Sequence, residues 1–212
     1  MSDELQPWNY FTSPIYSFDK KEYLPTVKEV VGEYFEEVKK TQKPNEIYPL
    51  LNTNSIHNDE RLEELVSFVV TTSHHILDSQ GYDMNQYRVE MYDFWCQEHH
   101  KSSGHERHVH NSIISGFYFV DCPKDSCRLL IHDPRQAKEY MQLIEKNMEN
   151  ATYASNSINF VPEEGQIIFT NSWLPHSFTR NESSKPFRMI HFNLGVIYTP
   201  QIISFSQNAE VI

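Results

Sequence analysis

The sequence contains few cysteines, little positive charge and no long apolar run. Its three cysteines, Cys96, Cys122 and Cys127, are an odd number in 212 residues, which argues against a disulfide framework and favours free thiols in a reducing compartment. No stretch approaches the roughly 20 consecutive apolar residues that a membrane helix needs, and no apolar signal-like run opens the chain. We therefore expect a cytoplasmic protein that has no membrane partner.

The excess of acidic residues argues against another class of partner. The chain has 18 Lys and Arg residues against 29 Asp and Glu residues, a formal net charge of -11, which repels phosphate backbones at long range. Nucleic acid is therefore not an expected partner. A length of 212 residues suits one domain with a core of its own, and the sequence makes no prediction about oligomeric state.

Helical patterns occupy the first third of the chain. Within residues 22–40, apolar residues recur every three or four positions, as expected for a helix with one buried stripe. Asp19 is a candidate N-cap, and Pro25 lies in the first turn. A second helix is predicted over residues 62–77, ended by Gly81. We expect these two helices to support a sheet.

Strand patterns dominate from Tyr87 onward, where short apolar or alternating runs are separated by turn residues, as is typical of a sandwich or barrel. The predicted strands are residues 87–95, 113–120, 128–131, 158–161, 166–170, 177–179, 187–194 and 202–205. Within residues 136–149, the spacing of apolar residues predicts one helical insertion. The expected fold is α+β and mainly β, a single domain over residues 1–212 with helical support in residues 1–84 and a β core in residues 85–212.

Histidines are concentrated just before one of these predicted strands, as His99, His100, His105, His108 and His110. Because alternate strand residues share a face, the imidazoles of His108 and His110 can hold one metal ion. His176, which follows the predicted strand 166–170, is the best candidate for a third ligand. Arg188 comes twelve residues later and would place a cation beside an open three-ligand metal site.

A lone His-x-His is weak evidence, because such pairs are also common at surfaces, but here it stands in an ordered set. A buried strand, a Pro-x-x-Gly turn, another strand, a third histidine and an arginine in a further strand follow it in that order. The carrying segments are residues 108–120, 133–135, 162–176 and 188–193. This set, which lies within about the last 110 residues, resembles the 2-oxoglutarate- and Fe(II)-dependent oxygenases, and specifically their prolyl-hydroxylase-like branch in bacteria and phages.

The resemblance implies a double-stranded β-helix, a jelly-roll-like barrel that holds Fe(II) at its open end and uses 2-oxoglutarate as cosubstrate with O2. His108 corresponds to the family's first ligand and His176 to its distal ligand. His110 stands where most of the superfamily has a carboxylate, which gives a neutral three-imidazole set in place of the usual facial triad. Asp133 or Glu106 is an alternative source of the carboxylate.

The resemblance also gives Arg188 a role, which is to pair with the far carboxylate of 2-oxoglutarate, a geometry that a guanidinium suits. The alternative is an ordinary surface salt bridge. If Arg188 faces the barrel interior, Ile190 and Phe192 share that face and His191 faces away, and the two bulky apolar neighbours favour this arrangement. Tyr118 either donates a hydrogen bond to the same carboxylate or is a packed core residue.

The expected function is that of a non-haem iron dioxygenase that hydroxylates a peptidyl or small-molecule substrate and releases succinate and CO2. One alternative is a cupin-type three-His dioxygenase that does not use 2-oxoglutarate, although cupins usually place a glutamate where this chain has Ile114 or Ser115. Another is a non-catalytic jelly-roll module that binds zinc through His105, His108, His110 and Cys96. Otherwise His99, His100 and His105 are expected in a solvated loop near the site.

Overall fold

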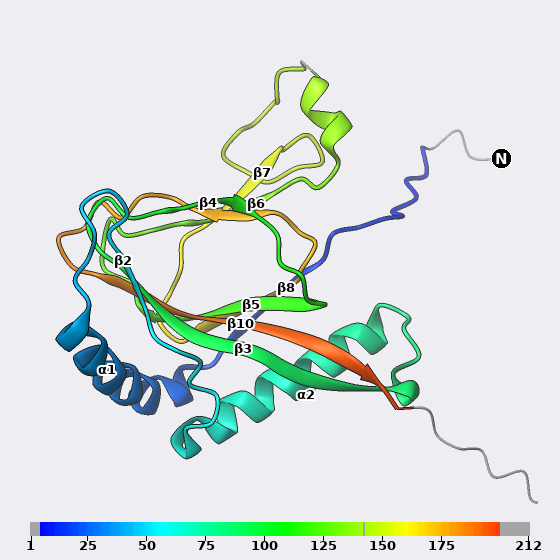
Figure 1. Cartoon of the computed structure of the whole chain (residues 1–212). Helices are drawn as coiled ribbons and strands as arrows, with labels where there is room; N and C mark the ends of the chain where they lie inside the picture. Colours follow the sequence, from blue (N-terminus) through cyan, green and yellow to red (C-terminus); the bar gives the residue numbers. More distant parts are fainter. Residues whose placement is uncertain (1–4, 142, 200–212) are drawn as a thin grey trace, which may run out of the picture.

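The computed structural model describes residues 5–141 and 143–199, which form two antiparallel sheets and two α-helices (Figure 1). The larger sheet has the strand order β1-β8-β5-β10-β3-β2, and the smaller one has the order β4-β9-β6-β7. The larger sheet contains β1 (Ile15–Asp19), β2 (Leu50–Asn52), β3 (Tyr87–His99), β5 (Ile114–Asp121), β8 (Gln166–Asn171) and β10 (Phe187–Tyr198). The smaller sheet contains β4 (His105–His108), β6 (Leu129–His132), β7 (Ser157–Phe160) and β9 (His176–Phe178).

Each face of the larger sheet is covered by a different layer. Helices α1 (Leu24–Thr41) and α2 (Glu63–Ser79) lie along one face, where their side chains share a buried cluster with Phe94, Ile190 and Phe192. The other face meets the smaller sheet, and a second buried cluster fills the space between them with residues from both sheets. The chain is therefore mainly β with two helices, as the sequence predicts.

Strand β10 is covered on both faces. The direction of each of its side chains therefore shows whether that side chain lies on the helix side or between the two sheets. Ile190, Phe192 and Leu194 belong to the helix-side cluster, whereas Phe187 and Met189 belong to the cluster between the sheets. Neighbouring residues of a strand point to opposite faces. Even-numbered residues of this stretch therefore face the helices, and odd-numbered residues face the smaller sheet.

The two predicted helices are present, although α1 begins in a different way from the expected one. Asp19 ends β1 and does not cap the helix, because the N-cap is Tyr23 and it makes no side-chain capping bond. Pro25 does occupy the first turn. A 3-10 turn, η1 (Lys21–Tyr23), connects β1 to α1. Helix α2 similarly follows η2 (Glu60–Leu62), and η3 (Met84–Gln86) leads into β3.

The helical insertion predicted over residues 136–149 is wrong. Among its described residues only a 3-10 turn, η4 (Gln136–Tyr140), is present. The apolar side chains of this segment are exposed, by 97% for Ile144 and 85% for Met148. Most helix stability in proteins comes from packing an apolar face against a partner, and this segment packs against none that would bury it.

Seven of the predicted strands match observed ones closely, and the eighth, residues 202–205, lies outside the described residues. The sequence analysis missed three short strands, β1, β2 and β4. Strand β4 is the important omission, because it carries His105 and His108 in a segment expected to be a loop. Neither α-helix in the described part of the chain has the length and apolar character that spanning a membrane requires.

Candidate metal centre

Three histidines from distant parts of the sequence meet at one end of the smaller sheet. His108 ends β4 and lies directly opposite His176, the first residue of β9. His110 follows two residues after β4, where its backbone N–H donates to the carbonyl of Ser172 at 3.0 Å. One ring nitrogen from each of His108, His110 and His176 lies within 4.8 Å of those of the other two. The predicted convergence is therefore present, although His110 reaches it from a loop and not from the strand.

Backbone carbonyls fix the orientation of two of these rings. The Nδ1–H of His108 donates to the carbonyl of Glu106 at 2.7 Å, and the Nδ1–H of His176 donates to the carbonyl of Leu174 at 3.1 Å. In each ring Nε2 is then left as the lone-pair nitrogen, which is how protein histidines are commonly prepared for a metal. The Nε2 atoms of His110 and His176 are 3.2 Å apart, so both face the same point.

The environment keeps two of these histidines, His110 and His176, neutral. Burial, together with the charge of His108 and other neighbouring histidines, lowers the pKa of His176 to about 3. The same causes lower the pKa of His110 to about 4. A histidine must be unprotonated to bind a metal, and both rings meet that condition at neutral pH.

A fourth imidazole, His191 of β10, lies beside the three. Its side chain is almost fully buried, with 2% exposed, and its ring centroid is 4.4 Å from those of His110 and of Trp95. Burial holds the pKa of His191 well below its usual range. The expectation that His191 faces away from the barrel interior is wrong. Because both faces of β10 are buried, apolar residues occupy both, and their pattern could not show which face is inward.

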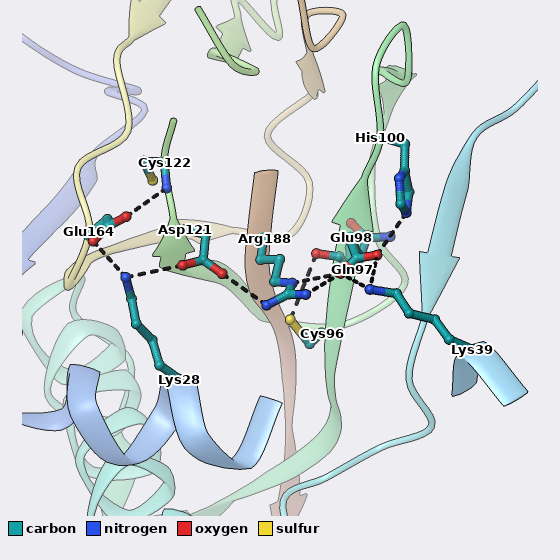
Figure 2. Close-up of polar contacts among 10 residues, drawn as sticks. All are labelled: Lys28, Lys39, Cys96, Gln97, Glu98, His100, Asp121, Cys122, Glu164 and Arg188. Atoms are coloured by element: carbon teal, nitrogen blue, oxygen red, sulfur yellow. Dashed lines mark hydrogen bonds and ion pairs between the residues drawn. The ribbon is translucent and has the colours of Figure 1, made fainter. Parts of the chain in front are cut away.

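Arg188 lies on the opposite face of β10, toward helix α1 (Figure 2). Its guanidinium carbon is 5.3 Å from the ring centroid of Phe35, its Nε donates to Glu98 at 2.7 Å, and its Nη1 donates to Asp121 at 3.2 Å. The expectation that Arg188 points into the barrel interior is therefore wrong. The alternative of a salt bridge is correct, but the bridge is buried rather than superficial.

Glu98 is the centre of the ion-pair network that holds Arg188 (Figure 2). Its carboxylate is fully buried and also contacts Lys39 of α1 at 2.8 Å and His100 at 2.7 Å. Burial alone would raise the pKa of Glu98, but hydrogen bonds and charges from Lys39 and Arg188 outweigh it and lower the pKa. The network thus ties α1 to β3 and β10 through charged groups.

The central part of the chain matches a known family. Residues 93–193 match a family model described as "Putative 2OG-Fe(II) oxygenase". The resemblance to the 2OG-Fe(II) oxygenases is confirmed. The matched segment contains all three clustered histidines. In a search of curated proteins, no sequence matches significantly.

Solved oxygenases share the fold at low sequence identity. A prolyl-4-hydroxylase from Pseudomonas putida has 12% identity and a TM-score of 0.55, covering 86% of this chain and 93% of its own. A prolyl hydroxylase from Trichoplax adhaerens, in complex with a hypoxia inducible factor peptide fragment, has 9% identity and a TM-score of 0.56, covering 86% of this chain and 84% of its own. The α-ketoglutarate-dependent epimerase SnoN from nogalamycin biosynthesis has 10% identity and a TM-score of 0.57, with coverages of 91% and 81%. At these identities the likeness concerns the fold alone.

The donor set fits the iron of a 2OG-Fe(II) oxygenase. Imidazole nitrogen suits Fe(II) as a ligand, and one ring nitrogen of each of the three histidines converges on the same place. The two carboxylates considered as alternatives to His110 are elsewhere. Asp133 pairs with Arg135 and Lys138, and Glu106 is exposed and contributes its backbone carbonyl to His108.

Tyr118 does not reach the cluster of three histidines. It lies in the helix-side cluster, and its hydroxyl donates to the carbonyl of Lys20 at 2.9 Å. The alternative of a packed core tyrosine is therefore correct. Burial accordingly raises the pKa of Tyr118 above its usual range.

The four-ligand zinc site of the alternative interpretation is not assembled. Cys96 is in the helix-side cluster, and the metal-binding group found among the described residues contains neither Cys96 nor His105. His105 does lie near, with its ring centroid 4.3 Å from that of His108, and its Nδ1 is 2.6 Å from the hydroxyl of Tyr48. His99 is buried at the end of β3 and His105 begins β4, so the expected solvated loop is wrong for these two histidines, whereas His100 does lie in the loop between the strands.

Proposed function

We propose that this protein is an Fe(II)- and 2-oxoglutarate-dependent dioxygenase that hydroxylates a peptidyl or small-molecule substrate and releases succinate and CO2. The convergence of His108, His110 and His176 carries the proposal, supported by the family match of residues 93–193. We take residues 1–212 as one oxygenase domain. When bound, the iron and its cosubstrate supply, with O2, the oxidant that hydroxylates a C–H bond.

The protein's own contribution is to hold the metal and to keep water away from it. His108, His110 and His176 would be the metal ligands, and three protein ligands leave coordination positions open for the cosubstrate. The apolar cluster between the sheets reaches the site, because the ring centroid of Phe117 is 5.2 Å from that of His176. This apolar surface would exclude water from one side of a metal bound by the three histidines.

A cavity beside His176 is the proposed entrance for the substrate. It has a volume of about 490 Å³ and lies between the N-terminal residues 8–13 and strands β6 and β7. Its wall includes Ile131 and Leu174. Ile131 pairs with His176 across the sheet, and the carbonyl of Leu174 accepts the hydrogen bond from His176. The cavity wall therefore adjoins a proposed metal ligand.

The proposed activity is tested without knowledge of the substrate. Under anaerobic conditions, the protein with Fe(II) and 2-oxoglutarate is expected to develop a weak visible charge-transfer band. Under air, the same mixture is expected to release succinate, slowly without substrate and faster when a candidate amino acid, peptide or nucleoside is a substrate. Intact metal binding with neither the band nor succinate would reject 2-oxoglutarate-dependent oxygenation.

The position of Arg188 favours a second candidate, a three-His dioxygenase that uses no 2-oxoglutarate. Such an enzyme needs no cation to hold a cosubstrate carboxylate, and Arg188 is engaged on the helix side of β10. The two candidates differ in their cosubstrate requirement. Oxygen consumption by the iron-loaded protein with a substrate, undiminished when 2-oxoglutarate is omitted, would support this second candidate.

A further inference from the structure

His191 has unused hydrogen-bonding capacity beside the metal ligands. Both its Nδ1 and its Nε2 are buried and have no hydrogen-bond partner within the described structure. A neutral imidazole offers one N–H donor and one acceptor. Leaving such buried groups unpaired costs folding free energy, and an unpaired group of this kind calls for a bound partner or a functional role.

The inner face of β10 becomes polar where it approaches the metal ligands. Phe187 and Met189 are part of the apolar cluster between the sheets, whereas His191 and Asn193, next on the same face, are polar. Asn193 accepts a hydrogen bond from Ser115 at 2.7 Å, and the Ser115 hydroxyl is 2.8 Å from that of Ser172. A polar ligand bound at this end would meet hydrogen-bonding side chains, and His191 is the one with both nitrogens unpaired.

The structure argues against two other roles for His191. It is not part of the group whose ligand nitrogens lie within 4.8 Å of one another, so it is not placed as a fourth ligand of the same ion. It is also not a simple space-filling ring, because a phenylalanine would fill the gap between Trp95 and His110 without burying two polar atoms. Its contacts with these two rings, with centroids 4.4 Å away in each case, hold the imidazole plane in place.

The interior offers little other means of binding an anion. In the described part of the chain, no lysine or arginine is fully buried, and Arg188 is committed to Glu98 and Asp121 on the other face of β10. A carboxylate bound between the sheets would therefore depend on neutral N–H and O–H donors. Among the groups that could supply such a donor, the His191 ring has its centroid 4.4 Å from that of His110.

We propose that His191 donates its ring N–H to a carboxylate oxygen of 2-oxoglutarate bound beside His110, which is the anchoring role that Arg188 does not fill. The inference rests on the proposed function, since it needs 2-oxoglutarate as the cosubstrate. In this role His191 binds and orients the cosubstrate, whereas the metal is bound by His108, His110 and His176.

The test measures cosubstrate binding in the absence of turnover. Wild-type protein, His191→Phe and His191→Gln are loaded anaerobically with Co(II), and the dissociation constant for 2-oxoglutarate is measured by titration calorimetry. His191→Phe keeps an aromatic ring between Trp95 and His110 but has no N–H, so we expect unchanged cobalt stoichiometry and a dissociation constant raised at least about tenfold, or about 1.4 kcal/mol. His191→Gln retains an N–H donor and should recover part of the affinity.

The matched control is His99→Phe. His99 is another fully buried imidazole, on the adjacent strand β3, and it lies among aromatic rings 6.0 Å from Phe178 and Phe187. This variant should bind 2-oxoglutarate as the wild type does. Thermal unfolding of all variants identifies any that is misfolded, and His191→Gln then provides the second measurement.

The possible results separate the inference from the proposed function. Wild-type affinity for 2-oxoglutarate in His191→Phe would overturn the role of His191 and leave the oxygenase proposal standing. Loss of cobalt from folded His191→Phe would also overturn it, because His191 would then support the metal itself. Cobalt-loaded wild-type protein that does not bind 2-oxoglutarate would reject the proposed function, and the inference with it.

Discussion

His176→Ala protein is expected to lose at least about 100-fold in affinity for a divalent metal and to release no succinate. Replacing outer partners of metal ligands already costs about 10–100-fold in metal affinity, and His176 is proposed as a ligand itself. Its Nε2 lies 3.2 Å from that of His110, so its removal takes away the ring that faces His110 across the site. Titration with Co(II), followed by its visible absorption, measures the affinity directly.

A matched control for this variant is His105→Ala. The ring of His105 lies 4.3 Å from that of His108, which is as close as several contacts within the site, yet His105 is not in the metal-binding group. We expect His105→Ala to keep its cobalt affinity within a few-fold of the wild type. If His176→Ala binds cobalt as tightly as the wild type while remaining folded, the three-histidine centre is wrong.

The convergence of the three histidines could be predicted from the sequence, because it rests on the residue type and on the order of the histidines and strands along the chain. His108 and His110 precede the buried strand β5, and His176 follows strand β8. Because β5 and β8 pair antiparallel, the start of the first strand lies beside the end of the second, and the histidines come to the same end of the molecule. The structure adds that His110 lies beyond the end of β4. The expected alternation along a strand therefore predicted three histidines that do cluster, through a local geometry that is not present.

The orientation of β10 could not be predicted for a physical reason. A strand with one exposed face shows alternating apolar and polar residues, but β10 lies between the helices and the smaller sheet, and seven consecutive residues from Met189 to Gly195 are buried. Apolar neighbours therefore carry no information about which face is inward. Arg188 therefore lies on the helix side of β10, where His191 was expected, and His191 lies beside His110, where Arg188 was expected. The proposed role of binding 2-oxoglutarate accordingly passes from Arg188 to His191.

The conformations of strand β4 and of residues 136–149 depend on contacts with distant parts of the chain, which a local sequence pattern does not show. Strand β4 has only four residues, of which the middle two are exposed and the end two are partly buried. It therefore shows no apolar signature, and its pairing with β9 forms it. Residues 136–149 have helical spacing but lack a surface that would bury the apolar stripe. In both cases tertiary contacts decide the conformation.

The Glu98→Gln variant tests the alternative role of Arg188 and is expected to lose about 3–5 kcal/mol of unfolding free energy, the usual cost of breaking a buried ion pair. Glu98 is fully buried and faces both Arg188 and Lys39, so neutralising it leaves two cations without their shared carboxylate. Urea unfolding followed by circular dichroism measures the loss. The control is Glu37→Gln. It removes an exposed partner of Lys40 on the same helix, α1, and should cost at most about 1 kcal/mol.

The double variant Glu98→Gln with Arg188→Met separates the network from the metal site. Replacing both partners of a buried pair often costs far less than replacing one, so the double variant should regain part of the stability lost in Glu98→Gln. We expect Arg188→Met by itself to lower stability and to leave 2-oxoglutarate affinity unchanged, because its guanidinium lies toward Phe35 of α1. Full stability with a sharply weakened affinity for 2-oxoglutarate would show instead that Arg188 serves the cosubstrate, and would contradict the orientation of β10 on which the role of His191 depends.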